Sequence, residues 1–202
     1  WGGNRNWHWH WHDHAHNWWK WATAATVTRW VVDGFYNRQP VYYNYGTSVY
    51  YDSGTVYQEG QPIATEEEYA EQAQTIATSI PEVEPDDVEW MPLGVFALTQ
   101  DGQASGPEPT IFLQLAISKE GIIAGTIQNT ATDNSAEVEG TIDQESQRAA
   151  WGVVDKSWPI MECGIYNLTE DEASALLHFE NGDTQQWLMV RLEEPESAEQ
   201  TQ

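Results

Sequence analysis

The chain has 202 residues, enough for one sizeable domain or two small ones. Its formal net charge of −24 is unevenly spread, because residues 1–50 carry a net charge of +2 and residues 51–202 a net charge of −26. Because such an acidic surface repels nucleic acid and anionic membranes, we expect no nucleic-acid partner. We also expect no membrane span, because there is no apolar run of about 18 residues.

The chain opens on a Trp/His track, residues 1–17, in which tryptophan and histidine alternate. In an extended strand alternate side chains point to opposite faces, so one face carries indoles and the other imidazoles. The imidazoles are candidate ligands for a divalent metal, the one cofactor we consider: His8, His10, His12, His14 and His16. Neighbouring ligands would lie about 6–7 Å apart along one strand, so a tetrahedral site needs a second, facing strand. The alternative is a low-complexity segment whose imidazoles stack or hydrogen-bond between subunits.

The tryptophans of this region are candidate interface residues: Trp7, Trp9, Trp11, Trp18, Trp19 and Trp21. Exposed indoles stack on sugar rings, which makes a glycan a possible partner. Burial against another protein chain is the favoured interpretation, because so much apolar surface rarely stays exposed and tryptophan is enriched at interface hot spots. We therefore expect a second copy of the chain, in an oligomer or a fibre, as the partner.

Residues 18–80 are predicted to form a small aromatic unit of helix, β-strands and helix. Trp18, Trp21, Ala25, Thr28 and Val32 recur at helical spacing. Three β-rich runs follow at 41–43, 48–51 and 55–57, in which tyrosines are placed to form cross-strand pairs. A capping box then starts the clearest helix of the chain, which ends before a proline. The residues of that helix are Thr65 and Glu68 at the cap, the apolar stripe Tyr69, Ala73, Ile76 and Ile80, and Pro81 at the stop.

The second half is predicted to be one antiparallel β-barrel domain, residues 90–192. An acidic linker at 81–89 precedes it, and a disordered acidic tail at 193–202 follows. Eight runs with strand character recur at intervals of roughly 8–12 residues: 92–99, 110–118, 121–129, 136–143, 147–154, 160–166, 175–180 and 184–192. The fold class is therefore mostly β: a small aromatic sheet plus one helix, then an up-and-down barrel of about eight strands that folds on its own.

The residues with chemical potential in the second half give no sign of an enzyme. Cys163, the single cysteine, alternates with Met161 and Ile165 and is predicted to face the core as a small hydrophobe. His178 lies opposite the apolar face of its run, which favours a solvated position. No nucleophile elbow, phosphate-binding loop or spaced metal-ligand motif is present, so we expect no catalytic residues.

Several phrases of the chain resemble uncharacterised secreted or surface proteins of planctomycete bacteria, which are often labelled mu-protocadherin-like. The phrases are VYYNYGTSVYY, EEEYAEQAQTIA, EWMPLGVFAL, GIYNLTEDE and TQQWLMVRLE, and the similarity spans most of residues 18–194. Such proteins carry a low-complexity region ahead of this part. The resemblance implies an exported protein at the cell surface or outside the cell, with an upstream segment that precedes Trp1, and it implies no activity.

A second resemblance concerns architecture only. GIIAGTIQN, VEGTID, AAWGVV, ECGIY and TQQW are similar, in order, to strand phrases of avidin-type barrels. The resemblance implies Trp151 and Trp187 as ligand-contacting residues. At other positions that match ligand residues of those barrels the chain has Ile127, Asn129 and Glu162. We therefore expect the closed barrel without biotin binding.

Together these patterns predict an exported structural or adhesive module of a bacterial cell-surface or extracellular assembly, which self-associates through its aromatic N-terminal region. The alternative is a β-barrel that binds a small ligand or a glycan through Trp151 and Trp187. A solvent-accessible cavity beside these two tryptophans would favour the alternative. A barrel filled with leucine and isoleucine would favour assembly.

Overall fold

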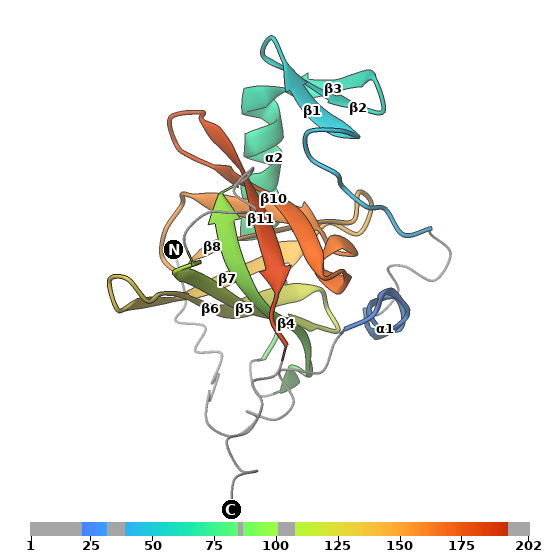
Figure 1. The fold of residues 1–202 in the computed structure, drawn as a ribbon. Coiled ribbons are helices and arrows are strands. Elements are labelled where there is room, and N and C mark those ends of the chain that lie inside the picture. The colour runs from blue at the N-terminus through green and yellow to red at the C-terminus, as the bar shows by residue number, and fades with distance from the viewer. Residues whose placement is uncertain (1–21, 32–38, 85–86, 101–107, 194–202) are drawn as a thin grey trace, which may run out of the picture.

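The structure, a computed structural model, describes residues 22–31, 39–84, 87–100 and 108–193 (Figure 1). Over these residues the chain forms a closed eight-stranded antiparallel barrel, a separate three-stranded sheet and two α-helices. The predicted fold class is confirmed. The Trp/His track with its five candidate metal ligands, the six candidate interface tryptophans and the tail beyond residue 193 lie outside the described residues.

The barrel strands follow one another around the wall in chain order, each antiparallel to the next. They are β4 (Trp90–Gln100), β5 (Ile111–Ser118), β6 (Ile122–Asn129), β7 (Asn134–Ile142), β8 (Arg148–Val153), β9 (Ile160–Gly164), β10 (Glu172–His178) and β11 (Thr184–Arg191). β11 pairs back with β4, from Trp187 opposite Gln100 to Arg191 opposite Phe96. Closure leaves the barrel without an exposed sheet edge. All eight predicted strands are present, with bounds that shift by a few residues.

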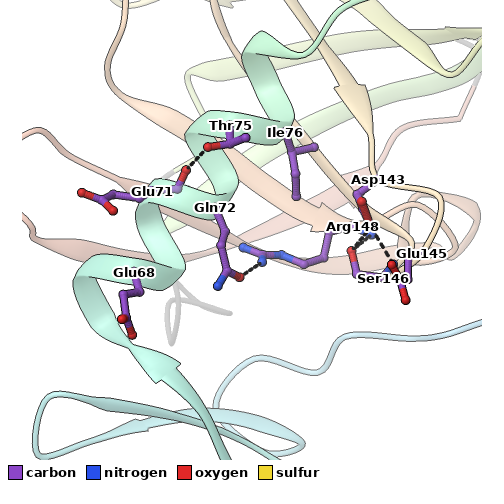
Figure 2. A pocket seen from close by; sticks show the side chains of 9 residues that line it. All are labelled: Glu68, Glu71, Gln72, Thr75, Ile76, Asp143, Glu145, Ser146 and Arg148. Carbon is purple, nitrogen blue, oxygen red and sulfur yellow. Dashed lines mark hydrogen bonds between the residues drawn. The ribbon is translucent and has the colours of Figure 1, made fainter.

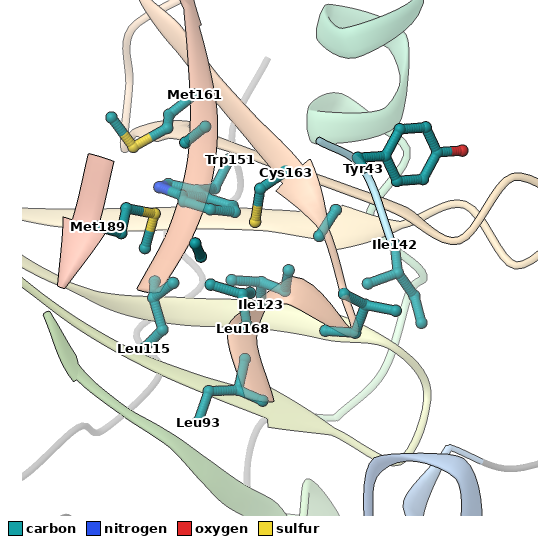
Figure 3. Packing of buried hydrophobic residues seen from close by; sticks show 14 of the residues in the cluster. Tyr43, Leu93, Leu115, Ile123, Ile142, Trp151, Met161, Cys163, Leu168 and Met189 are labelled. Carbon is teal, nitrogen blue, oxygen red and sulfur yellow. The ribbon is translucent and has the colours of Figure 1, made fainter. Parts of the chain in front are cut away.

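The barrel interior is filled with apolar side chains (Figure 3). Trp151 is the largest of them and is 2% exposed. Gly140 lies opposite it, and a Cβ atom there would come within 2.8 Å of the Trp151 Cβ, so the glycine makes room for the indole. Figure 3 shows Met161, Met189 and Cys163 around the same indole. The predicted inward position of Cys163 is confirmed, and burial raises the pKa of its thiol well above the ordinary value.

One end of the barrel is held together by a buried arginine, Arg191. Its guanidinium donates hydrogen bonds to the carbonyl oxygens of Leu93 (2.6 Å), Glu170 (3.3 Å) and Leu168. It also lies 4.8 Å from the centre of the Phe96 ring. One charged group thereby ties the last strand to the first strand and to the turn between β9 and β10.

The small sheet consists of β1 (Val49–Asp52), β2 (Thr55–Gln58) and β3 (Gln61–Thr65), in that order. Tyr50 and Tyr57 stack across β1 and β2 with ring centres 5.2 Å apart, which confirms the predicted pairing for these two tyrosines. The predicted strand at 41–43 is wrong, because the third strand is β3 instead. β3 contains Pro62, which an edge strand such as this one tolerates.

The segment before β1 lies along the barrel and takes its hydrogen bonds from side chains rather than from a neighbouring strand. The Val41 N–H donates to the Gln147 side chain (2.7 Å). The Asn167 amide accepts from the Tyr43 N–H (2.8 Å) and donates to the Tyr43 carbonyl (2.9 Å). A Cβ atom at Gly164 would come within 2.7 Å of the Tyr43 ring, so this glycine lets the ring approach the wall. These contacts explain why a β-rich run does not form a strand.

Helix α2 (Glu66–Thr78) covers β7, β8 and β9 from outside the barrel. The predicted capping box is confirmed: the Thr65 hydroxyl accepts from the Glu68 N–H (3.1 Å), and the Glu68 carboxylate accepts from the Thr65 N–H (2.8 Å). Tyr69 and Ala73 are buried as predicted, whereas Ile80 lies beyond the end of the helix.

Helix α1 (Ala24–Trp30) lies against the barrel at another place (Figure 1). The helix begins at the cap residue Thr23, and its buried side chain is Val27. Ala25, which the predicted stripe placed on the inner face, is exposed. Trp30 fixes the helix because its indole N–H donates to the Ile117 carbonyl (3.0 Å). Neither described helix combines the length and the apolar character that a membrane crossing requires.

The N-terminal unit and the barrel share one hydrophobic cluster. Val27, Tyr43 and Tyr69 belong to the same cluster as Trp151 and the other residues of the barrel core. The outer wall of the barrel is therefore buried where this unit covers it. We revise the expectation that residues 90–192 fold alone, because that fragment would expose an apolar and ionic surface that the whole chain buries.

Candidate functional site

A row of polar side chains crosses the outer wall of the barrel beneath the N-terminal unit. We call it the polar row: Arg148 on β8, Glu162 on β9, His178 on β10 and Thr184 on β11. Neighbours in sequence of Arg148, Glu162 and His178 belong to the core cluster, so these three side chains point outward. Thr184 is paired with His178 across β10 and β11 and lies on the same outer face. The prediction that His178 is solvated is wrong, since the residue is fully buried. Its outward direction was predicted correctly, but the covering unit removes it from water.

Arg148 and Glu162 form a buried ion pair, with side chains 5% and 0% exposed. The Arg148 guanidinium donates through Nε (2.9 Å) and Nη2 to the same carboxylate oxygen. It also donates to the Gln72 side chain (2.9 Å) and to the Tyr69 carbonyl (3.2 Å). The guanidinium carbon lies 3.8 Å from the centre of the Tyr69 ring. A single arginine thus connects helix α2 to the barrel wall.

The other carboxylate oxygen of Glu162 faces Tyr45 and His178. The Tyr45 hydroxyl donates to it (3.3 Å), and the His178 Nε2 lies 3.5 Å away. Burial by itself would raise the pKa of Glu162, but the charge of Arg148 and the contact with His178 hold that pKa below its ordinary value. Glu162 is therefore ionised, and burial next to this charge raises the pKa of Tyr45 well above the ordinary value.

His178 links the ion pair to Thr184, whose hydroxyl lies 2.9 Å from the His178 Nδ1. The order hydroxyl, imidazole, carboxylate is also that of a hydrolytic triad. In such a triad the carboxylate stabilises the imidazolium that forms. Here Arg148 already compensates the charge of Glu162, so the carboxylate gives the imidazole little help. The geometry favours an anchor for α2 and the tyrosines over a catalytic site.

At its Arg148 end the polar row reaches an acidic groove of about 610 Å³ between α2 and the turn from β7 to β8 (Figure 2). The groove is lined by Glu68, Glu71, Gln72, Thr75, Ile76, Asp143, Glu145, Ser146 and Arg148. Asp143 is engaged by the Ser146 N–H (2.6 Å) and hydroxyl (2.8 Å). Within the described part of the chain, no three histidine, cysteine or acidic side chains gather as metal ligands would.

At its Thr184 end the polar row reaches a second groove, of about 650 Å³, which we call the tyrosine groove. It lies between the small sheet and the hairpin that joins β10 to β11. Its lining residues are Tyr45, Gly46, Tyr50, Tyr51, Glu66, Leu176, Gly182, Asp183, Thr184, Gln185 and Gln186. Apart from the glycines and one leucine, the lining is aromatic or polar.

The two tryptophans that the avidin resemblance implied lie elsewhere. Trp151 is part of the packed core, and Trp187 is half-buried against that core with its indole N–H directed at the Gln185 side chain (3.3 Å). Neither lines the acidic groove or the tyrosine groove. The structure therefore does not bring Trp151 and Trp187 together around either groove.

The ion pair of Arg148 and Glu162 was not predicted from the sequence, although a signal was present. Glu162 is a lone acid in the apolar run Ile160–Gly164, and Arg148 is followed by Ala149 and Ala150 in the preceding strand. Charged residues are almost never fully buried unless they are paired. Opposite charges in two adjacent predicted strands could thus have been read as a buried pair.

No protein family matches the chain. No curated protein and no solved structure matches it either.

Proposed function

We propose that the protein is an exported structural or adhesive module of a bacterial cell-surface assembly, and that it self-associates through the Trp/His track. The observation that carries this proposal is the filled barrel. Trp151 and its apolar neighbours occupy the space in which a ligand-binding barrel holds its ligand. This packing favours assembly over the alternative of an interior ligand site at Trp151 and Trp187.

The distribution of charge supports the same proposal. Residues 51–202 carry a net charge of −26, so two copies repel each other through this part. Association then needs a segment that is not acidic, and residues 1–50 with their net charge of +2 are the only such region. Each tryptophan buried at an interface contributes on the order of 2–3 kcal/mol, so several together exceed a screened repulsion.

Sedimentation velocity of the full chain at pH 8 and pH 5.5 tests this proposal. We expect association at pH 8 and dissociation at pH 5.5, because protonated imidazoles repel each other along one strand. The combined variant Trp7→Ser, Trp9→Ser, Trp11→Ser should stay monomeric at both pH values. Its matched control replaces the five track histidines with glutamine, and it should associate at both. The proposal fails if all three proteins sediment as one species under both conditions.

A further inference from the structure

We propose that the tyrosine groove binds an uncharged carbohydrate chain. This inference rests on the proposed function in one respect, since it names the class of partner for an adhesive role. It does not depend on self-association, because the groove is built entirely from described residues outside the Trp/His track.

The chemistry of the lining excludes the other common ligand classes. No lysine or arginine lines the groove, and the body of the protein is strongly acidic, so an anionic ligand is repelled. Leu176 is the one large aliphatic side chain of the lining and is itself 2% exposed, so an apolar ligand finds little to cover. What remains is aromatic rings beside hydroxyl, amide and carboxylate groups. A sugar presents the complement, with C–H faces that pack on rings and hydroxyls that donate and accept.

The polar groups of the groove are held in place before any ligand arrives. The Gln186 amide donates to the Tyr45 carbonyl (2.9 Å). Gly46 has a φ of +88°, and a Cβ atom there would lie 3.1 Å from the Gln186 amide oxygen, so a glycine fits both the turn and the amide. The Thr184 hydroxyl is held by His178 (2.9 Å). Fixed donors and acceptors of this kind reduce the ordering that binding requires.

The tyrosines that β1 contributes to the groove are fixed as well, one by each face of the strand. Tyr50, which lines the groove, stacks on its cross-strand neighbour Tyr57 with ring planes inclined by only 6°. Tyr51 meets the buried Tyr69 edge to face at 6.3 Å. The groove volume of about 650 Å³ lies within the range of about 300–1,000 Å³ that is typical of small-molecule sites.

A cationic ligand is the closest competitor, since two acids line the groove. Asp183, however, already accepts a hydrogen bond from the Asn181 amide (2.7 Å). Of the two carboxylates that line the groove, Glu66 is then the one with no hydrogen bond to another described residue, and the lining also contains two glutamines and a threonine. One carboxylate among several neutral hydrogen-bonding groups suits a polyhydroxyl ligand better than an ammonium group.

Titration calorimetry of the full chain with five hexasaccharides tests the proposal: cellohexaose, xylohexaose, mannohexaose, maltohexaose and N-acetylchitohexaose. We expect saturable binding of at least one. Tyr50→Ala and the isosteric Glu66→Gln should each weaken that binding at least tenfold. Tyr42→Ala is the matched control and should change it less than twofold, because Tyr42 is 40% exposed, packs near Tyr166 and does not line the groove. A thermal melt of each variant establishes that it is folded.

Three results would overturn the proposal: no binding of any of the five sugars, binding of tetramethylammonium without sugar binding, or sugar binding that persists in both groove variants. The variant Trp7→Ser, Trp9→Ser, Trp11→Ser separates the two proposals. If it loses self-association but binds sugar as the wild type does, the groove proposal stands on its own. If it loses sugar binding, the sugar lies on the track and the groove proposal fails.

Discussion

Replacing Glu162 with glutamine should destabilise the protein strongly, because the change leaves the buried Arg148 without its counter-charge. Glutamine keeps the shape of the side chain, and its amide oxygen can still accept from the guanidinium, but both hydrogen bonds lose their negatively charged acceptor. Breaking a buried ion pair by removing one partner costs about 3–5 kcal/mol. Arg148 keeps its bonds to Gln72 and Tyr69, so we expect the lower end, about 3 kcal/mol.

For a chain of this length, 1 kcal/mol corresponds to a Tm change of about 2–4 °C, so Glu162→Gln should lower the Tm by about 6–12 °C. Urea unfolding followed by near-ultraviolet circular dichroism gives the free energy directly. The double variant Arg148→Met, Glu162→Gln removes both charges and should recover at least about 1.5 kcal/mol relative to the sum of the two single changes.

The matched control is the exposed ion pair between Lys119 and Glu89, whose side chains are 35% and 64% exposed. Glu89→Gln should change the free energy of unfolding by less than about 1 kcal/mol, because solvent screens the pair. A loss for Glu162→Gln that is no larger than the loss for Glu89→Gln would refute the reasoning. It would mean that water reaches the polar row and that the N-terminal unit does not cover it.

Four further predictions concern the pH dependence of stability, the cap of α2, a close strand contact and the barrel on its own. The pKa of Glu162 in the folded protein lies below the ordinary 4.5, so as the pH falls the carboxyl group is protonated in the unfolded chain before it is protonated in the folded one. The ionised carboxylate therefore stabilises the folded state above pH 4.5, and this contribution is lost as the pH falls below that value. Urea melts across that range should show a shallower loss in Glu162→Gln than in the wild type. Thr65→Ala removes the helix cap and should lower the free energy of unfolding by about 1 kcal/mol in the same melts. An unchanged free energy of unfolding would argue against the capping box. Gly140→Ala should cost at least about 1–3 kcal/mol, because its Cβ would lie 2.0 Å from the Ala150 carbonyl oxygen; a Tm equal to that of the wild type would disprove the close strand contact. Residues 90–192 expressed alone should melt without cooperativity in circular dichroism, and a sharp transition would restore the earlier expectation that the barrel folds independently.

The barrel could be predicted from the sequence because its signal is local. Ile111, Leu113 and Leu115 alternate with other side chains along one strand. An alternation with a period of two residues indicates both that the segment is a strand and which of its faces points inward. Turn residues at regular spacing then give the meander. The helix after Thr65 was predictable for the same reason, since its cap lies within four residues.

The polar row could not be predicted in the same way, because it depends on contacts distant in sequence. Alternation placed His178 on the outer face correctly, but periodicity contains no information about what covers that face. The cover is Tyr45, Tyr69 and the rest of the N-terminal unit, about 100 residues earlier in the chain. The segment at 41–43 shows the same limit, since its β-rich composition is overridden by hydrogen bonds that its backbone N–H groups donate to the side chains of Gln147 and Asn167.

The central claim is that the protein works as an assembling module whose association depends on residues 1–17. Negative-stain electron microscopy of the full chain at pH 8, beside a form that lacks these residues, tests it most directly. We predict closed oligomers or fibres for the full chain and single particles for the shortened form. Single particles of one chain in both samples, at every protein concentration, would contradict the claim.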